Sequence, residues 1–139
     1  MHNRHAGVLT TWKQPLSEDH FAEIFIWASR EELRAAHKLD DGRTYGRCEC
    51  FWACYKEDAG KKTNLSGRKF GEVHFVLADI GVGYVAHELQ HLVSYWCQFM
   101  QWTLENNDED IAYFCEMVTR DFWTQFYQLY PEARERGAA

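Results

Sequence analysis

A long amphipathic segment between residues 83 and 102 places the strongest constraint on how this chain can fold. At the helical spacing of about 100° per residue, its apolar side chains fall on one continuous stripe. The stripe consists of Val85, Leu89, Leu92, Val93, Trp96, Phe99 and Met100. Because such a stripe has to be buried against other elements, the sequence predicts a long helix with one face in the core.

A second helical pattern runs from residue 108 to about residue 130 and ends before Pro131. Residues 105–107, Glu-Asn-Asn, predict a break between the two helices. The apolar stripe of the second helix consists of Ile111, Phe114, Val118, Phe122 and Leu129. Its reverse face carries Glu109, Tyr113, Glu116 and Arg120. We expect the two helices to pack by their apolar stripes.

The first half of the chain has the pattern of a small sheet. Runs rich in β-branched and aromatic residues predict strands at 21–27, 45–56 and 70–78, with a short helix at about 30–39 after the first. The Gly/Lys/Asn-rich stretch between the last two strands favours a hairpin. The predicted fold is α+β, with about three strands, one short helix and two long helices in a single domain over residues 1–139. The least order is expected at 1–16 and 131–139.

Composition excludes some classes of partner. The chain of 139 residues has a formal net charge of −6, whereas nucleic-acid binders usually carry a basic stripe. Its one basic cluster, at residues 61–69, surrounds a turn signal and is expected to be a surface loop. No apolar run reaches the length of a signal peptide or a membrane span. Five cysteines, an odd number, fit a reducing compartment, so a cytoplasmic protein without nucleic-acid or membrane partners is expected.

The first long helix also carries a pattern typical of metal binding. His87 and His91 lie four residues apart and project away from the apolar stripe, with Glu88 between the two faces. Imidazoles at this spacing can chelate one zinc ion, and a third carboxylate ligand leaves a position open for a water whose pKa falls towards about 7. Glu88 is placed to accept the proton of that water and pass it to the leaving amine. The pattern predicts one zinc per chain and hydrolysis of a peptide or protein substrate.

The run Gly-Tyr-Val-Ala-His-Glu-Leu-Gln-His at 83–91, followed by Glu-Asp-Ile-Ala-Tyr at 109–113, resembles the minigluzincins. These small zinc metallopeptidases, with relatives in bacteria and phages, pair a His-Glu-x-x-His helix with a "glutamate helix" carrying Glu-x-x-Ala. The resemblance covers about residues 72–126. It implies a zincin-like fold, with His87, His91 and Glu109 as zinc ligands and Glu88 as the general base. It also implies that the strand at 70–78 is the edge strand along which a peptide adds.

Some site residues remain open at this point. Glu116 lies seven residues beyond Glu109 on the same face and could be the third ligand, although an i,i+4 pair with Arg120 is its expected role. Larger gluzincins often have an acidic residue where this chain has Tyr113, four positions after the ligand glutamate. Tyr113 and His74 are the candidates for stabilising the oxyanion of the reaction.

The cysteines allow two interpretations. Cys48, Cys50 and Cys54 fall on one face of a predicted strand and could form a second metal site with His74. Their spacing lacks the Cys-x-x-Cys turn of structural zinc sites, so buried strand cysteines are expected instead. Cys97 and Cys115, on the two long helices, are expected to be packing residues.

Two other functions compete with the peptidase. The first is an acidic binding or inhibitor protein in which zinc only stabilises the fold, and the second is zinc-dependent hydrolysis of a non-peptide substrate. The presence of Glu88 favours catalysis, because a structural zinc site does not need that carboxylate. Specificity is expected to depend on the loop at 55–71 and on the aromatic residues Tyr95, Trp102, Trp123 and Tyr127. Substrate identity and oligomeric state do not follow from the sequence.

Overall fold

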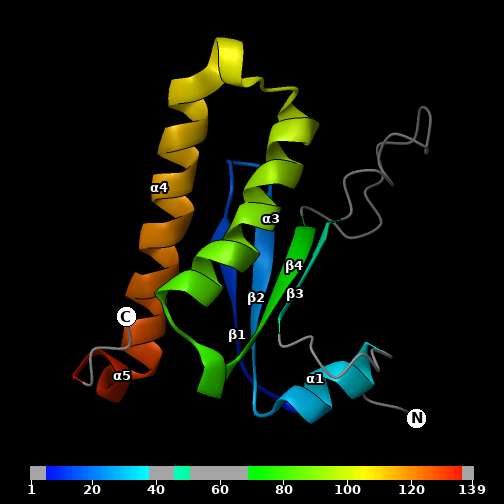
Figure 1. Cartoon of the computed structure of the whole chain (residues 1–139), viewed down its shortest axis with the longest axis vertical. Coiled ribbons are helices and arrows are strands. Elements are labelled where there is room, and N and C mark those ends of the chain that lie inside the picture. Colours follow the sequence, from blue (N-terminus) through cyan, green and yellow to red (C-terminus); the bar gives the residue numbers. More distant parts are fainter. Residues whose placement is uncertain (1–5, 38–45, 51–68, 136–139) are drawn as a thin grey trace.

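A computed structural model describes residues 6–37, 46–50 and 69–135 (Figure 1). The strands are β1 (Val8–Pro15), β2 (Phe21–Trp27), β3 (Gly46–Cys50) and β4 (Lys69–Val76). The helices are α1 (Arg30–Ala36), the 3-10 turn η1 (Leu77–Asp79), α3 (Val82–Met100), α4 (Leu104–Leu129) and α5 (Pro131–Glu135). The α+β class and the two long helices predicted from the sequence are confirmed. No helix in the described ranges combines the length and apolarity that crossing a bilayer requires.

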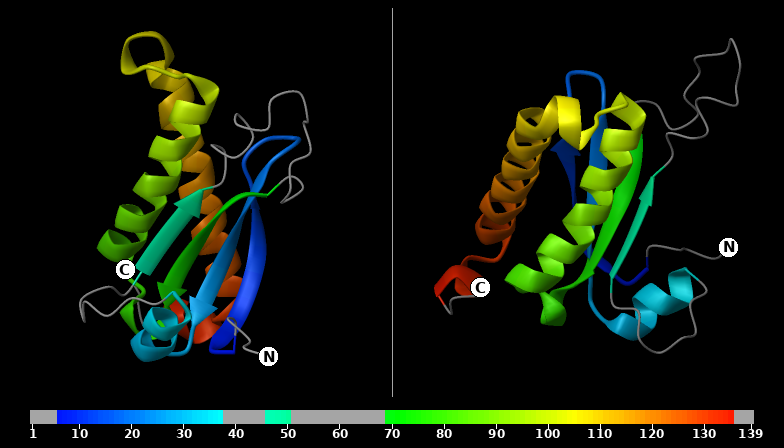
Figure 2. Two further views of the ribbon diagram at one scale, coloured as in Figure 1. Left: turned by 90° about the vertical axis from the view of Figure 1, so that its right-hand side faces the viewer. Right: turned by 45° about the horizontal axis from the view of Figure 1, so that its top comes forward.

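The sheet has four strands in the order β1-β2-β4-β3. β1 pairs antiparallel with β2, β2 parallel with β4, and β3 antiparallel with β4, as the hairpin prediction requires. Helices α3 and α4 cover one face of the sheet, and α1 lies at its other side (Figure 2). β4 therefore lies inside the described sheet, and the prediction that residues 70–78 form the edge strand is wrong. The edges of the described sheet are β1 and β3.

β1 is a strand that the sequence analysis missed. Its face towards α4 carries polar side chains, which conceal the usual alternation. Thr10 bonds the Tyr130 hydroxyl at 2.9 Å, and the buried Gln14 donates from Nε2 to Asp121 Oδ2 at 3.0 Å. These partners satisfy polar groups that would otherwise be costly to bury. Residues 8–15 thus form a strand, and residues 131–135 form α5, in the two end regions where the least order was expected.

The main core lies between the sheet and the two long helices. From α3 it takes Val85, Leu89, Leu92, Val93 and Trp96, and from α4 it takes Phe114, Val118, Phe122 and Phe126. The predicted stripes are confirmed over most of their length. They fail at the helix ends, where Met100 and Leu129 are exposed. The predicted break at 105–107 is a kink inside α4, where Asn107 has non-helical angles.

A smaller apolar cluster lies on the other face of the sheet. It contains Phe25 and Trp27 of β2, Leu33 of α1 and Val76 of β4. Ser29 caps α1 by accepting a hydrogen bond from the Glu32 backbone N–H at 3.2 Å. α1 thereby presents Leu33 to the sheet, and the sheet is buried on both faces in this region.

Trp96 is the residue through which α3 joins α4 and the sheet. It is 2% exposed, stacks on Phe114 with ring centroids 5.5 Å apart, and meets Phe70 at 5.1 Å. We expect Trp96→Ala to lower the free energy of unfolding by about 3–5 kcal/mol, because the cavity lies where three elements meet. Tyr95→Ala is the matched control, because it also replaces an aromatic residue of α3 by alanine but at a 36% exposed position. It should lower the free energy of unfolding by less than about 1 kcal/mol. Urea unfolding followed by circular dichroism measures both, and equal losses would contradict this packing.

Candidate metal and catalytic site

The two motif histidines lie together on the outer face of α3. Their ring centroids are 5.0 Å apart, and the His87 side chain is 69% exposed. Both residues point away from the apolar stripe, because residues 87 and 91 are offset from Leu89 and Val93 by about half a helical turn. The prediction that they are not core histidines is confirmed.

Glu88 occupies the boundary between the buried and exposed faces of α3. Its side chain is buried, and Oε2 lies 3.9 Å from Nε2 of His87. Burial raises the pKa of the Glu88 carboxyl, and the nearby His87 and His91 offset that rise only in part. The carboxylate is therefore held beside the histidine pair in a place of restricted access to water.

Gly46, the first residue of the edge strand β3, lies directly against the Glu88 side chain. A Cβ atom at Gly46 would lie 2.9 Å from the Glu88 carboxyl carbon and 2.7 Å from a ring carbon of Tyr84. Tyr84 lies one helical turn before Glu88, and its hydroxyl accepts a hydrogen bond from the Val76 backbone N–H at 3.0 Å. Burial raises the Tyr84 pKa. Neither residue was predicted from the sequence; the i,i+4 spacing of Tyr84 and Glu88 was the available signal for Tyr84, and Gly46 had none.

Glu109 is not brought to the histidines. α3 and α4 run side by side in opposite directions (Figure 1), and the stacked rings of Trp96 and Phe114 mark a common level. At a rise of about 1.5 Å per residue, His91 lies about 8 Å from that level towards the start of α3. Glu109 lies about 8 Å from it in the opposite direction, towards the turn between the helices. The two residues are thus separated by about 15 Å along the helix axes.

Glu116 lies closer to the level of the histidines. It is two residues beyond Phe114, which places it about 5 Å from the level of His91 along the axes. Its predicted partner is wrong: Arg120 has its ion pair with Asp121, from Nε to Oδ1 at 3.6 Å, and not with Glu116. Across the described residues, no three side chains of His, Cys, Asp or Glu gather in a way that could hold a metal ion. The histidine pair and Glu88 are therefore the part of the predicted site that the structure brings together.

His74 belongs to a different environment from the one predicted. It is fully buried, and the Trp27 indole N–H donates to its Nδ1 at 2.9 Å. Nε2 therefore carries the ring proton, which it donates to Glu72 Oε1 at 2.9 Å. The ring stacks on Phe25, its register neighbour in β2, on the face of the sheet that α1 covers. His74 thus lies across the sheet from α3 and cannot stabilise an oxyanion beside Glu88.

The other oxyanion candidate, Tyr113, also lies apart from the histidines. It is 64% exposed on α4 and lies one residue from Phe114 on the side of the interhelical turn. That position is about 9 Å from the level of His91 along the helix axes. Neither Tyr113 nor His74 is therefore brought next to the histidine pair.

The structure gives the backbone register of two strand cysteines and the packing of the two helix cysteines. In the β3–β4 register, Cys48 pairs with Val73 and Cys50 with Gly71, whereas His74 pairs with Arg47. The two cysteine positions alternate with that of His74, so a metal site that combines them is not supported. Cys54 lies outside the described residues. Cys97 and Cys115 pack against the main core, as predicted.

Comparisons with known proteins add nothing to this geometry. No protein-family model, curated protein sequence or solved structure matches the chain. The likeness to minigluzincins therefore depends on the two motifs, at residues 83–91 and 109–113, and on no other similarity.

The buried Glu72 makes stability depend on pH. Burial alone would raise the pKa of its carboxyl, but hydrogen bonds from His74 and Lys69 and the Lys69 charge lower it to about 2. A depressed folded-state pKa gives stability that is complete above about pH 4.5, the unfolded value, and is lost as the pH falls towards 2. We expect Glu72→Gln to cost on the order of 2 kcal/mol at neutral pH, and the difference from wild type to shrink with acidification.

Urea unfolding at intervals between pH 2 and pH 7 measures this dependence. Glu31→Gln, at a side chain that is 79% exposed on α1, is the control and should follow wild type at every pH. Parallel curves for wild type and Glu72→Gln would show that the carboxylate does not carry the acid dependence.

Proposed function

We propose that this chain is a zinc-dependent peptidase with its site on the outer face of α3. The observation that carries the proposal is the placement of His87 and His91, whose rings face solvent with centroids 5.0 Å apart. Neutral imidazoles in an i,i+4 pair are a donor set that zinc favours, and a surface position leaves room for further ligands and a substrate. These residues fit the metal that the motif implies, and a zincin-like fold is part of the proposal.

The third ligand in this proposal is a carboxylate of α4, and two residues compete for the role. The resemblance to minigluzincins favours Glu109. The level along the helix axes favours Glu116, about 5 Å from that of His91 compared with about 15 Å for Glu109. Glu116 is also released from its expected pairing, because Arg120 pairs with Asp121.

Zinc bound at such a site acts as a Lewis acid and makes a water molecule nucleophilic near neutral pH. The protein's own contribution is Glu88, which would take up the proton of the attacking water and deliver it to the leaving amine. Gly46 and Tyr84 confine the Glu88 carboxylate from two sides and so limit the positions it can adopt. A fixed carboxylate beside the histidine pair is the geometry that this proton transfer needs.

β3 is the strand that we propose for binding the substrate backbone. It is an edge of the described sheet, and at Gly46 it adjoins Glu88. An extended peptide that pairs with an open strand edge places its backbone beside that strand. This assignment moves the substrate strand from β4, which the resemblance implied, to β3.

A second function is favoured by one observation. The formal net charge of −6 suits an acidic binding or inhibitor protein in which a zinc ion would only stabilise the fold. Glu88 distinguishes the two functions, because only catalysis requires its carboxylate.

Zinc content tests the site. Wild type should hold about one zinc per chain by plasma emission spectrometry, and His91→Ala should bind zinc at least tenfold more weakly, because two ligands chelate worse than three. Of Glu109→Ala and Glu116→Ala, one should show the same loss and thereby identify the third ligand. Glu105→Ala, in the first turn of α4, is the matched control and should keep its zinc. Full zinc binding by His91→Ala would contradict the site.

Activity of Glu88→Gln tests catalysis separately. The variant should keep its zinc and lose peptidase activity by about 10²-fold or more, because the amide cannot accept the proton. Hydrolysis of an unfolded protein substrate, followed by mass spectrometry, measures the loss, with Glu105→Gln as the unaffected control. Zinc-loaded wild type that cleaves no peptide would favour the binding protein, and cleavage of esters or non-peptide amides instead would favour the third class of function.

A further inference from the structure

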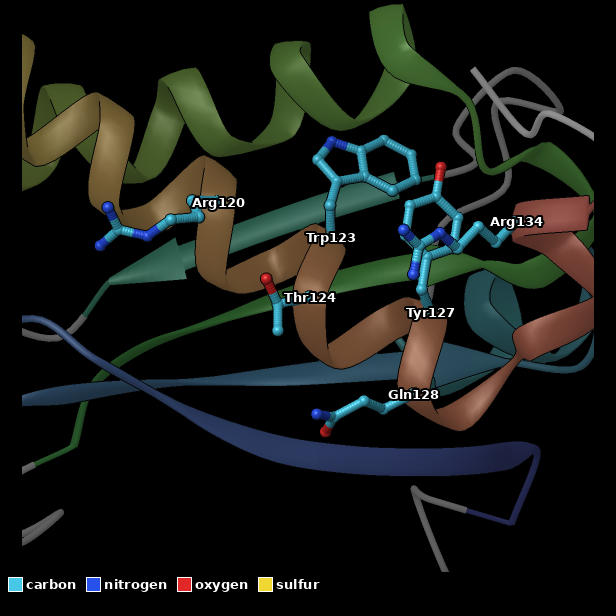
Figure 3. Close-up of a pocket in the computed structure, with 6 residues that line it drawn as sticks. All are labelled: Arg120, Trp123, Thr124, Tyr127, Gln128 and Arg134. Atoms are coloured by element: carbon cyan, nitrogen blue, oxygen red, sulfur yellow. The ribbon is translucent and has the colours of Figure 1, made fainter.

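A groove of about 420 Å³ runs along the outer face of α4 (Figure 3). Its lining residues are Arg120, Trp123, Thr124, Tyr127, Gln128 and Arg134. The first five are spaced i, i+3, i+4, i+7 and i+8 and therefore share one helix face. Arg134 comes from α5, which turns back after Pro131 and closes one end. The volume lies in the range of small-ligand and peptide sites, about 300–1,000 Å³.

The charge of this groove is opposite to that of the whole chain. The protein has a formal net charge of −6, yet the groove is lined by two arginines and no carboxylate. Arg120 pairs through Nε with Oδ1 of Asp121 at 3.6 Å, and the other oxygen of that carboxylate, Oδ2, accepts a hydrogen bond from the buried Gln14. Guanidinium groups form their strongest hydrogen bonds with carboxylates and phosphates, so the groove is suited to an anion.

Two aromatic side chains form the middle of the groove. Trp123 and Tyr127 stack with ring centroids 5.4 Å apart at 28°, and Trp123 also meets Phe122 and Phe126 edge-on. Figure 3 shows Arg134 extending from α5 towards Tyr127, with Arg120 at the opposite end. Arg120 and Tyr127 are seven residues apart, so their backbone positions lie about 10 Å apart along the axis of α4. The two arginines therefore serve opposite ends of the groove, and a single carboxylate does not reach both.

The groove lies at the level of the histidine pair. From the stacked Trp96 and Phe114, Arg120 lies about 9 Å along α4 and His91 about 8 Å along α3, in the same direction. Trp123 and His87 both lie about 14 Å from that level. Since packed helices have axes about 8–10 Å apart, the groove and the histidine pair belong to neighbouring stretches of the two helices.

We infer that the groove binds an acidic, extended segment of the peptide substrate. An extended segment with two acidic side chains can direct one carboxylate to each end of the groove, towards Arg120 and towards Arg134. The backbone between them lies on Trp123 and Tyr127, and Thr124 and Gln128 supply further hydrogen-bonding groups. Its role as a substrate subsite rests on the proposed peptidase function, whereas the binding itself does not require zinc.

The test uses the full chain as Glu88→Gln, with zinc removed by a chelator, and follows the indole N–H signals by NMR. Trp123→Phe identifies the signal of Trp123 among the six tryptophans. The probe is the end-blocked peptide Ala-Glu-Ala-Ala-Glu-Ala, and its matched control replaces both Glu by Gln. We expect a saturable shift of the Trp123 signal with the first peptide and at least tenfold weaker binding of the second. Arg120→Gln and Arg134→Gln should each weaken binding about tenfold, and Arg34→Gln, on α1 across the sheet, should not.

Equal binding of the two peptides would overturn the inference, and so would inorganic phosphate that displaces the acidic peptide at the same concentration. A parallel assay of zinc-loaded wild type separates the two proposals. If the acidic peptide binds but no peptide is cleaved, the inference about the groove holds and the proposed peptidase function fails. If the Glu and Gln peptides are cleaved with equal kcat/KM, the peptidase function holds and the groove is not its substrate subsite.

Discussion

The structure depends on the burial of one face of α3 against the sheet. Five apolar residues of that helix, from Val85 to Trp96, are buried, and together they remove several hundred Å² of apolar surface from water. Because this face of α3 is buried, helical geometry places His87 and His91 on the opposite face, towards solvent. The same constraint places Glu88 at the boundary, where the edge strand can cover it. The chemistry proposed for this chain is thus a consequence of how one helix packs.

The edge strand β3 restricts the space around Glu88 of α3. β3 approaches α3 closely enough that a side chain at Gly46 would collide with Glu88 and Tyr84. Tyr84 in turn bonds the backbone at Val76, the last residue of β4, so helix and sheet are tied together one turn from the carboxylate. The opposite face of the sheet holds a separate polar network around His74 and Glu72. The two faces of the sheet therefore differ: one packs against α3 and α4 through the main core, and the other holds the buried polar network.

Local periodicity explains which features could be predicted from the sequence. The spacing of Leu89, Leu92 and Trp96 defines a buried face without knowledge of any partner, and it places the histidines correctly. The order of the strands could not be predicted, because β2 and β4 pair across the intervening α1 and β3, and the polar Gln14 disguises β1. The level of α4 relative to α3 depends on the stacking of Trp96 with Phe114, a long-range contact. For the same reason, neither the distance from Glu109 to the histidines nor the groove closed by α5 was visible in the sequence.

The most direct test of the central claim is the zinc K-edge X-ray absorption spectrum of the zinc-loaded chain. The account predicts a first shell of nitrogen and oxygen at about 2.0–2.1 Å, with the outer-shell features of two imidazoles and no sulfur. A shell of sulfur at about 2.3 Å would place the metal on cysteines instead. That result would contradict the assignment of His87 and His91 and would remove the basis for the proposed peptidase.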